Sequence, residues 1–226
     1  MVSDFEIKQN TAKLFFNTLP KDAVLALKKC SQMDFLLRDK WYLAGGTALA
    51  LQSGHRRSYD LDFFTENKTF DEKGVEKILY EQGEWITNNI SEGTVFGILS
   101  KTKMSFIAYP FFTPAEKICK FGTVSLLAIP DIAVMKIIAI SQRGKKRDFF
   151  DLYWICQNIV PLHESILKID KQYNIRQNLT HILKSLVYFD DAETDPEPEI
   201  YFKATWKEVK KFFIKEIPQI AKKIIK

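Results

Sequence analysis

The sequence predicts an α+β protein, because segments with strand character gather in the middle of the chain and helical segments occupy both ends. Every strand candidate falls within residues 41–129. A doubly wound sheet would instead alternate strands and helices along its whole length. The 226 residues are 46% hydrophobic, enough to bury a core, which excludes a disordered or fibrous protein. We therefore expect a small mixed sheet flanked by helices and continued by a helical C-terminal region.

The first elements predicted are helices, followed by a short strand and a glycine pair. Apolar residues recur at helical spacing over residues 4–39, and Pro20 divides this helical lead-in into two helices. WYLAGG (41–46) then predicts a strand that ends in a tight turn, and TALALQSG (47–54) predicts a short helix. The glycine pair is therefore expected between a strand and the start of a helix.

The next segment, YDLDFFT (59–65), alternates strictly between two kinds of side chain. Successive side chains of a strand point to opposite faces, so Asp60 and Asp62 share one face and the aromatic and aliphatic residues share the other. This pattern predicts a strand with two acids on one side.

The rest of the middle region predicts one helix and several strands. The expected helix covers residues 71–82, and three consecutive strands linked by turns at Glu92-Gly93 and Lys101-Thr102 cover residues 84–91, 94–100 and 103–110. After Pro114 we expect a short helix, and VSLLAI (124–129) predicts the last strand.

Helices are expected to fill the remainder of the chain. Pro130 in a first turn, with Asp131 near the positive end, marks the start of an apolar helix that carries Lys136. Further helices are expected at residues 147–160, 161–173, 175–188 and 203–224. The acidic segment 190–199, with its prolines, is expected to lack structure. We expect two domains, an α/β core with its lead-in over residues 1–130 and a helical domain over residues 131–226.

Composition also bears on where the protein works. The longest uncharged stretches, residues 104–115 and 152–163, are shorter than the ~18 residues that a membrane helix needs. The first residues contain charges and no apolar run, so we expect no secretory signal. Three widely spaced cysteines form neither a disulfide framework nor a zinc motif and suit a reducing compartment. These observations predict a cytoplasmic protein that does not bind membranes.

The net charge of +5 arises in the C-terminal tail. Residues 200–226 contain eight lysines against two glutamates, together with aromatic residues at helical spacing. An amphipathic helix that packs its aromatic residues inward explains this pattern best. The alternative is that the lysines contact the backbone of an RNA, an interaction that would weaken steeply with added salt.

Residues 45–64 contain the strongest candidates for chemistry. Gly45 and Gly46, between a strand and a helix N-terminus, would let backbone N–H groups approach an anion, although the pair could equally be a plain turn. Asp60 and Asp62 would repel each other unless a cation lies between them, and Mg²⁺ with its preference for oxygen ligands is the natural ion. Arg56, Arg57 and Ser58 lie between the glycine pair and the acids, and His55 precedes them, which favours an anion pocket over an exposed strand edge.

Four ordered blocks within residues 40–155 resemble one known family. The blocks GGTALAL, GHRRSYDLDFF, LLAIPDIAVMK and KKRDFFDLY are similar to those of the nucleotidyltransferase family of AbiEii/AbiGii and MenT-type toxins, within the DNA polymerase β-like superfamily. After Tyr153 the similarity is one of general helical character. Neither a P-loop motif nor a nucleophile elbow is found, so a P-loop NTPase and a Ser-His-Asp hydrolase are excluded.

The resemblance implies a role for each block. Gly45, Gly46 and Thr47 would hold the triphosphate of a nucleotide, with Arg56, Arg57 and Ser58 nearby. Asp60 and Asp62 would carry Mg²⁺, Lys136 would contact the nucleotide phosphates, and Asp148 and Asp151 lie in the block where the family needs an aspartate. The implied reaction transfers a nucleotide from an NTP to an acceptor such as the 3′ end of tRNA, and the implied partner is a separately encoded antitoxin.

Several alternatives stay open from the residues themselves. A lone lysine on an apolar helix usually reaches for the surface, and Asp148 and Asp151 could simply form surface ion pairs with Arg147 and Lys145. The strand 103–110 has Ser105 but no acid where many enzymes of the superfamily place a third carboxylate, so the general base is unassigned. Two other functions therefore remain, a transferase that is not toxic and acts on a small molecule or protein, and a catalytically silent nucleotide-binding module.

Overall fold

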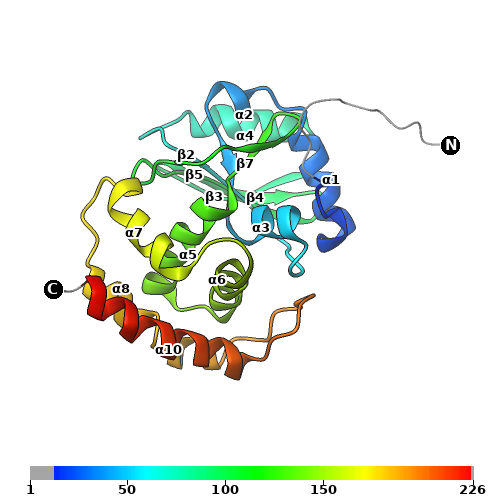
Figure 1. Ribbon diagram of the computed structural model, residues 1–226. Coiled ribbons are helices and arrows are strands. Elements are labelled where there is room, and N and C mark those ends of the chain that lie inside the picture. The colour runs from blue at the N-terminus through cyan, green and yellow to red at the C-terminus, as the bar shows by residue number, and fades with distance from the viewer. Residues whose placement is uncertain (1–12, 225–226) are drawn as a thin grey trace.

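The computed structural model describes residues 13–224, and its centre is one seven-stranded mixed sheet with the strand order β3-β4-β5-β2-β1-β7-β6. Helices pack on both faces of this sheet, and the C-terminal helices extend beyond one face (Figure 1). The strands are β1 Tyr42–Leu43, β2 Leu61–Thr65, β3 Trp85–Ser91, β4 Thr94–Leu99, β5 Thr102–Ala108, β6 Cys119–Phe121 and β7 Val124–Leu126. The α+β class and the mixed sheet expected from the sequence are confirmed.

The helices form two groups, those before and between the strands and those that follow the sheet. The first group comprises the 3-10 turn η1 Phe16–Thr18, α1 Lys21–Cys30, α2 Phe35–Arg38, α3 Gly45–Ser53 and α4 Glu72–Glu81. The second group comprises α5 Ile129–Arg143, α6 Lys146–Asn158, α7 Leu162–Gln172, α8 Leu179–Ser185, α9 Asp190–Glu193 and α10 Trp206–Ile224. None of the described helices is long and apolar enough to cross a membrane.

The centre of the sheet places the acidic strand between two neighbours. β2 pairs with β1 in antiparallel fashion and with β5 in parallel, and the second pairing sets Asp62 opposite Ser105. On one face, Phe63 stacks on Phe106 with ring centroids 5.1 Å apart, and Phe35 of α2 packs on Phe106 at 5.9 Å. Because side chains alternate along a strand, Asp62 points to the other face, where α5 packs.

Aromatic side chains attach the C-terminal helices to α6. Phe149 of α6 is fully buried and lies within 5.3–5.7 Å, between ring centroids, of Phe189, Trp206 and Phe213. α10 buries one face and exposes the other, which is the amphipathic helix expected from its aromatic residues.

Three sequence expectations differ from the structure in this region. The short helix expected after Pro114 is wrong, because the backbone N–H groups of Ala115 and Glu116 donate to the Asp131 carboxylate and β6 then pairs with β7. The acidic segment is ordered in part, since it contains α9. The helix expected from residue 175 begins at Leu179, where the Asn178 side chain caps it. The part of the helical lead-in within residues 4–12 lies outside the described residues.

The docking of α10 can be tested with two isoleucines of the same helix. Ile217 is 4% exposed and Ile214 is 55% exposed. We expect Ile217→Val to lower the free energy of unfolding by about 0.5–1.5 kcal/mol, because a buried methyl group is lost. Ile214→Val should change it by less than about 0.5 kcal/mol. Urea unfolding of both variants measures the difference, and equal effects would contradict this packing of α10.

Candidate active site

The glycine pair forms the start of α3, next to the acidic strand. Gly45 has a φ of +66°, a left-handed conformation that side chains rarely adopt, and a Cβ on it would lie 3.5 Å from an Asp62 carboxylate oxygen. A Cβ on Gly46 would lie 2.2 Å from Nη2 of Arg56. Gly45 is therefore favoured by its backbone conformation and Gly46 by the close approach of Arg56, and both leave the positive end of α3 open to an anion.

Hydroxyl groups tie the loop before β2 to α3. The Thr47 and Ser58 hydroxyls lie 2.8 Å apart, and Thr47 also donates to the Asp60 carbonyl. Both side chains are buried. This network holds Ser58 and Asp60 against the start of α3, so the predicted phosphate residues and the predicted metal residues lie together.

Asp60 and Asp62 lie close enough for their charges to interact. Burial and the charge of Asp62 both raise the pKa of Asp60. Among residues 13–224, Asp60 has one ion pair, with Nη1 of Arg147 at 4.0 Å, and Asp62 accepts a hydrogen bond of 2.6 Å from Ser105. Two neighbouring carboxylates with so little neutralisation fit a hard divalent cation such as Mg²⁺.

Within residues 13–224 no cluster of three or more acids, histidines or cysteines could hold a metal. Two protein carboxylates are a usual complement for Mg²⁺, whose other ligands are waters and substrate phosphates. Ser105 occupies the position on β5 that faces Asp62 in register, so no third carboxylate comes from that strand. The position on β5 that lacks an acid in the sequence is thus the position next to Asp62 in the site.

Lys136 is buried between two acids of α6. Its Nζ lies 2.6 Å from Asp148 Oδ1 and 2.6 Å from Asp151 Oδ2, and both carboxylates are fully buried. Arg143 makes a two-point contact with Asp148 at 2.9 and 3.1 Å. The interpretation of Lys136 as a surface lysine is therefore wrong. The interpretation of Asp148 and Asp151 as surface ion pairs is wrong as well, because their partners come from α5 and the loop after α3.

Arg56 and His55 share Asp151 from the other side. Arg56 donates to both carboxylate oxygens of Asp151, at 2.5 and 2.9 Å, and His55 Nε2 lies 2.7 Å from Oδ1. The cations Arg56 and Lys136 lower the pKa of Asp151 well below its ordinary value, although burial acts against them. Asp151 is thus an anion that holds three side chains in place, and it has no free face for a substrate.

Burial lowers the pKa of His55 below its ordinary value, even though Asp151 acts in the opposite direction. The folded protein therefore keeps His55 neutral at a pH where the unfolded chain takes up a proton. We expect the free energy of unfolding to fall as the pH drops below about 6.5, because protons then favour the unfolded state.

His55→Gln should flatten this part of the pH profile, and urea unfolding between about pH 7.5 and pH 5 measures it. The comparison of slopes cancels the contribution of other titrating groups common to both proteins. Parallel profiles for the two proteins would contradict the assignment.

The structure adds two cationic side chains to the site that the sequence reasoning missed. One predicted residue, Arg57, does not line the site. Arg143 and Arg147 line the same small cavity as Gly46 and Lys136. Arg143 follows Lys136 by seven residues, two helical turns, which is a signal that could have found it. Arg57 is not among the lining residues, since its backbone N–H donates to the Glu199 carbonyl and its side chain donates to the Asn17 carbonyl.

Two cavities meet at the acid pair. The smaller, of about 40 Å³, is lined by Gly45, Gly46, Thr47, Arg56, Ser58, Asp60, Asp62, Lys136, Arg143 and Arg147. The larger, of about 390 Å³, shares Gly45, Asp62, Lys136 and Arg143 with it and extends between the sheet and α5. We call them the cationic cavity and the apolar cavity.

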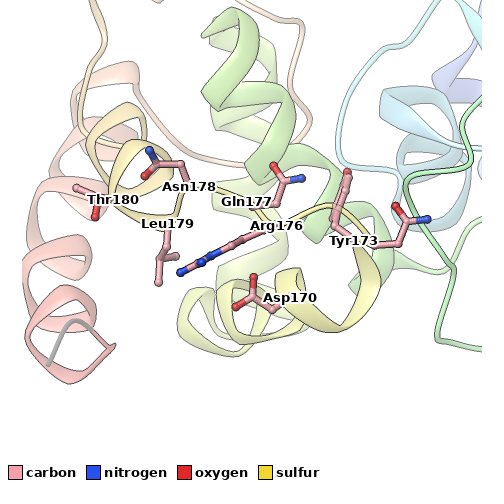
Figure 2. Close-up of a pocket in the computed structure, with 8 residues that line it drawn as sticks. Asp170, Tyr173, Arg176, Gln177, Asn178, Leu179 and Thr180 are labelled. Atoms are coloured by element: carbon pink, nitrogen blue, oxygen red, sulfur yellow. The ribbon is translucent and has the colours of Figure 1, made fainter.

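A hollow of about 780 Å³ lies at the corner between α7 and α8. Figure 2 shows its polar lining, with Arg176 and Asp170 among the labelled side chains. Its only residue in common with the apolar cavity is Tyr173, and it has none in common with the cationic cavity. The hollow is therefore separate from the acid pair.

Known proteins share this fold. A crystal structure described as a nucleotidyltransferase from H. pylori matches with a TM-score of 0.53 at 18% identity, covering 91% of this chain and 97% of that one. The nucleotidyltransferase toxin MenT4 from Mycobacterium tuberculosis H37Rv matches with a TM-score of 0.47 at 14% identity, covering 88% and 87%. The match to the first structure shows a shared fold, a sheet flanked by helices and followed by a helical C-terminal region.

The family follows from the sequence as a whole. The family model described as nucleotidyl transferase AbiEii toxin, type IV toxin–antitoxin system, matches residues 31–223. An uncharacterized protein of Aquifex aeolicus (strain VF5) is 34% identical to this chain over 206 residues. The match covers 89% of this chain and 97% of the relative. The chain belongs to the AbiEii family of nucleotidyltransferase toxins, as the four sequence blocks indicated.

Proposed function

We propose that this protein uses Mg²⁺ to transfer a nucleotide from an NTP to an acceptor such as the 3′ end of tRNA, with release of pyrophosphate. The observation that carries the proposal is the acid pair Asp60 and Asp62 beside a cavity lined by four cationic side chains. Carboxylates that share a divalent ion and cations that face phosphates are the parts that phosphoryl transfer needs.

The groups that line the cationic cavity would bind the triphosphate. Gly45 and Gly46 let the phosphates approach the start of α3, while Arg56, Lys136 and Arg143 supply positive charge. An ammonium group has three donors, and the two short contacts of Lys136 to Asp148 and Asp151 leave one for a phosphate oxygen. The two buried acids thus act as positioning residues that hold Lys136 and Arg56 toward the cavity.

Asp60 and Asp62 would bind the metal ion through their carboxylate oxygens, with Asp62 oriented by Ser105. A bound Mg²⁺ supplies Lewis-acid polarisation of the phosphate that is attacked. The charge that grows on the leaving pyrophosphate would be offset by Lys136 and Arg143 from α5. The Asp60 side chain is 39% exposed, so the acceptor can approach from its side of the site.

The location, partner and domain division are parts of the same proposal. An NTP and tRNA as substrates place the reaction in the cytoplasm, and membership of a toxin–antitoxin family supports a separately encoded antitoxin. We also propose the division into a core of residues 1–130 and a helical domain of residues 131–226, which is supported by β7 ending at Leu126 and by the helices that follow it.

The test is incubation of the protein with each labelled NTP, Mg²⁺ and total tRNA. We expect label to join the RNA and pyrophosphate to appear, both to stop with EDTA, and both to return with excess Mg²⁺. Nucleotide binding without transfer or pyrophosphate release, under every NTP, would contradict the proposal.

Gly46 offers a second test of the cationic cavity. Gly46→Ala places a methyl group 2.2 Å from the resting position of Arg56 Nη2, so the guanidinium has to move. We expect NTP affinity to fall at least about tenfold, a change of ~1.4 kcal/mol, because a charge-assisted contact is lost. Gly74→Ala is the control, since Gly74 also lies in a helix, its added methyl group would also meet the end of a side chain, Oδ2 of Asp71 at 2.3 Å, and it lines neither cavity at the acid pair. Equal NTP affinity in the two variants would contradict the role of Gly46.

A further inference from the structure

The apolar cavity is built from one stripe of α5 and one face of the sheet. Ile132, Met135, Ala139 and Gln142 lie three or four residues apart and form the α5 side. Phe64, Phe96, Ile107 and Tyr109 form the sheet side. The cavity is therefore a gap between two rigid elements rather than a hollow in a loop.

The neighbouring stripe of the same helix faces the cationic cavity. Lys136 and Arg143 are seven residues apart and line both cavities. One helix thus presents cations to the cationic cavity and apolar side chains to the apolar cavity, and the boundary between them lies at Asp62. A ligand that is charged at one end and largely apolar at the other would match this boundary.

The walls of the apolar cavity suit a flat, heterocyclic group. Phe64 and Tyr109 are partly exposed and lie edge to face with ring centroids 5.7 Å apart. Any of the nucleobases can stack on such aromatic side chains. The volume of about 390 Å³ falls in the range of pockets that enclose small organic ligands, ~300–1,000 Å³. The exposed amide of Gln142 at the end of the α5 stripe can both donate and accept hydrogen bonds.

We propose that the apolar cavity binds the ribose and base of the incoming NTP, and that Gln142 contributes to the choice of base. The proposal rests on the proposed function, since it requires the triphosphate to contact the groups that line the cationic cavity. The nucleoside is joined directly to the α-phosphate, so it has to lie in a cavity that shares walls with the phosphate site. The larger hollow between α7 and α8 (Figure 2) fails this requirement, because it shares no residue with the cationic cavity.

Filling the cavity tests the proposal. Ala139 is partly exposed in the cavity wall, so Ala139→Leu would occupy space that the nucleoside needs while leaving the positive charges of Lys136 and Arg143 in place. We expect affinity for all NTPs to fall at least about tenfold, because stacking on the aromatic wall is blocked. Affinity for inorganic triphosphate should stay unchanged. Ala221→Leu on α10, also at a partly exposed position, is the matched control and should change neither affinity.

Gln142→Ala is the companion variant. We expect it to leave affinity for inorganic triphosphate unchanged and to alter the relative affinities of the four NTPs by a few-fold or more. Thermal unfolding of both variants should resemble that of the wild type, since Ala139→Leu adds apolar contact and Gln142 is exposed.

Three outcomes would overturn the proposal. One is wild-type NTP affinity in Ala139→Leu. Another is an equal loss of NTP and inorganic triphosphate in that variant, which would mean that the change acts on the phosphate site. The third is unchanged NTP affinity with a raised KM for acceptor RNA, which would assign the cavity to the acceptor. If the wild-type protein itself binds no NTP, the proposed function fails instead.

Discussion

Asp60→Asn and Asp62→Asn are each expected to reduce nucleotide transfer by at least about 10²–10³-fold, because each removes a negative charge that would bind the catalytic metal ion. Asparagine keeps the shape of the side chain, and in Asp62→Asn the amide oxygen can still accept the hydrogen bond from Ser105. The measurement is incorporation of labelled nucleotide into RNA under saturating Mg²⁺ and NTP.

The same two variants should not lower the thermal stability. Burial and the neighbouring charge of Asp62 raise the pKa of Asp60, so the folded protein carries repulsion between the two acids that neutralisation removes. Glu92→Gln, at an exposed turn, is the control for loss of an acid elsewhere and should keep full activity. Transfer that survives in both active-site variants would end the assignment of Asp60 and Asp62 as metal ligands.

Asp151→Ala is expected to lower the free energy of unfolding by about 3–5 kcal/mol, because it leaves buried cations without their counter-ion. Asp151 is fully buried and contacts Arg56, Lys136 and His55. Urea unfolding measures the cost. Glu116→Ala is the matched control, since Glu116 forms an ion pair of 2.8 Å with Lys168 at the surface. That variant should lose only ~0–1 kcal/mol.

Low pH should weaken the contacts of Asp151 with Arg56 and Lys136. Arg56 and Lys136 hold the pKa of Asp151 well below its ordinary value. The stability from this contact is therefore fully present above the ordinary value of ~4 and is lost as the pH falls toward the lowered pKa. Asp151→Ala should show a shallower loss of stability in this acid range than the wild type. A cost for Asp151→Ala no larger than that of Glu116→Ala would contradict the role of Asp151 as the common partner of the three side chains.

Much of the fold could be predicted because strands and helices follow local patterns. The alternation over residues 59–65 predicted β2, and the apolar periodicity after Pro130 predicted α5. The helix expected after Pro114 is absent because Asp131, which lies farther along the chain, captures the backbone N–H groups of Ala115 and Glu116. Part of the acidic segment is ordered because Asp195 accepts hydrogen bonds from Lys145 and from the Lys146 backbone at the start of α6.

Part of the candidate site could also be predicted from local patterns, and part could not. Gly45, Gly46, Asp60 and Asp62 lie within 20 residues, so their proximity could be expected from the strand, turn and helix that carry them. Arg57 follows Arg56 directly, yet the structure turns it toward Asn17 and Glu199. No pattern in the sequence distinguishes the two arginines, because their orientation depends on where Asp151 and the segment after α9 lie.

The sequence by itself determined the class of fold, the family, and the acid pair beside the glycine turn, because backbone geometry and short spacing fix which neighbouring side chains share a face. Only the tertiary structure decided that Asp148 and Asp151 hold Lys136, Arg56 and Arg143 from inside, and that an apolar cavity adjoins the acid pair. The physical reason is distance. Arg56 and Asp151 are 95 residues apart along the chain but 2.5 Å apart in space, and such a contact exists only once α3, α5 and α6 have packed together.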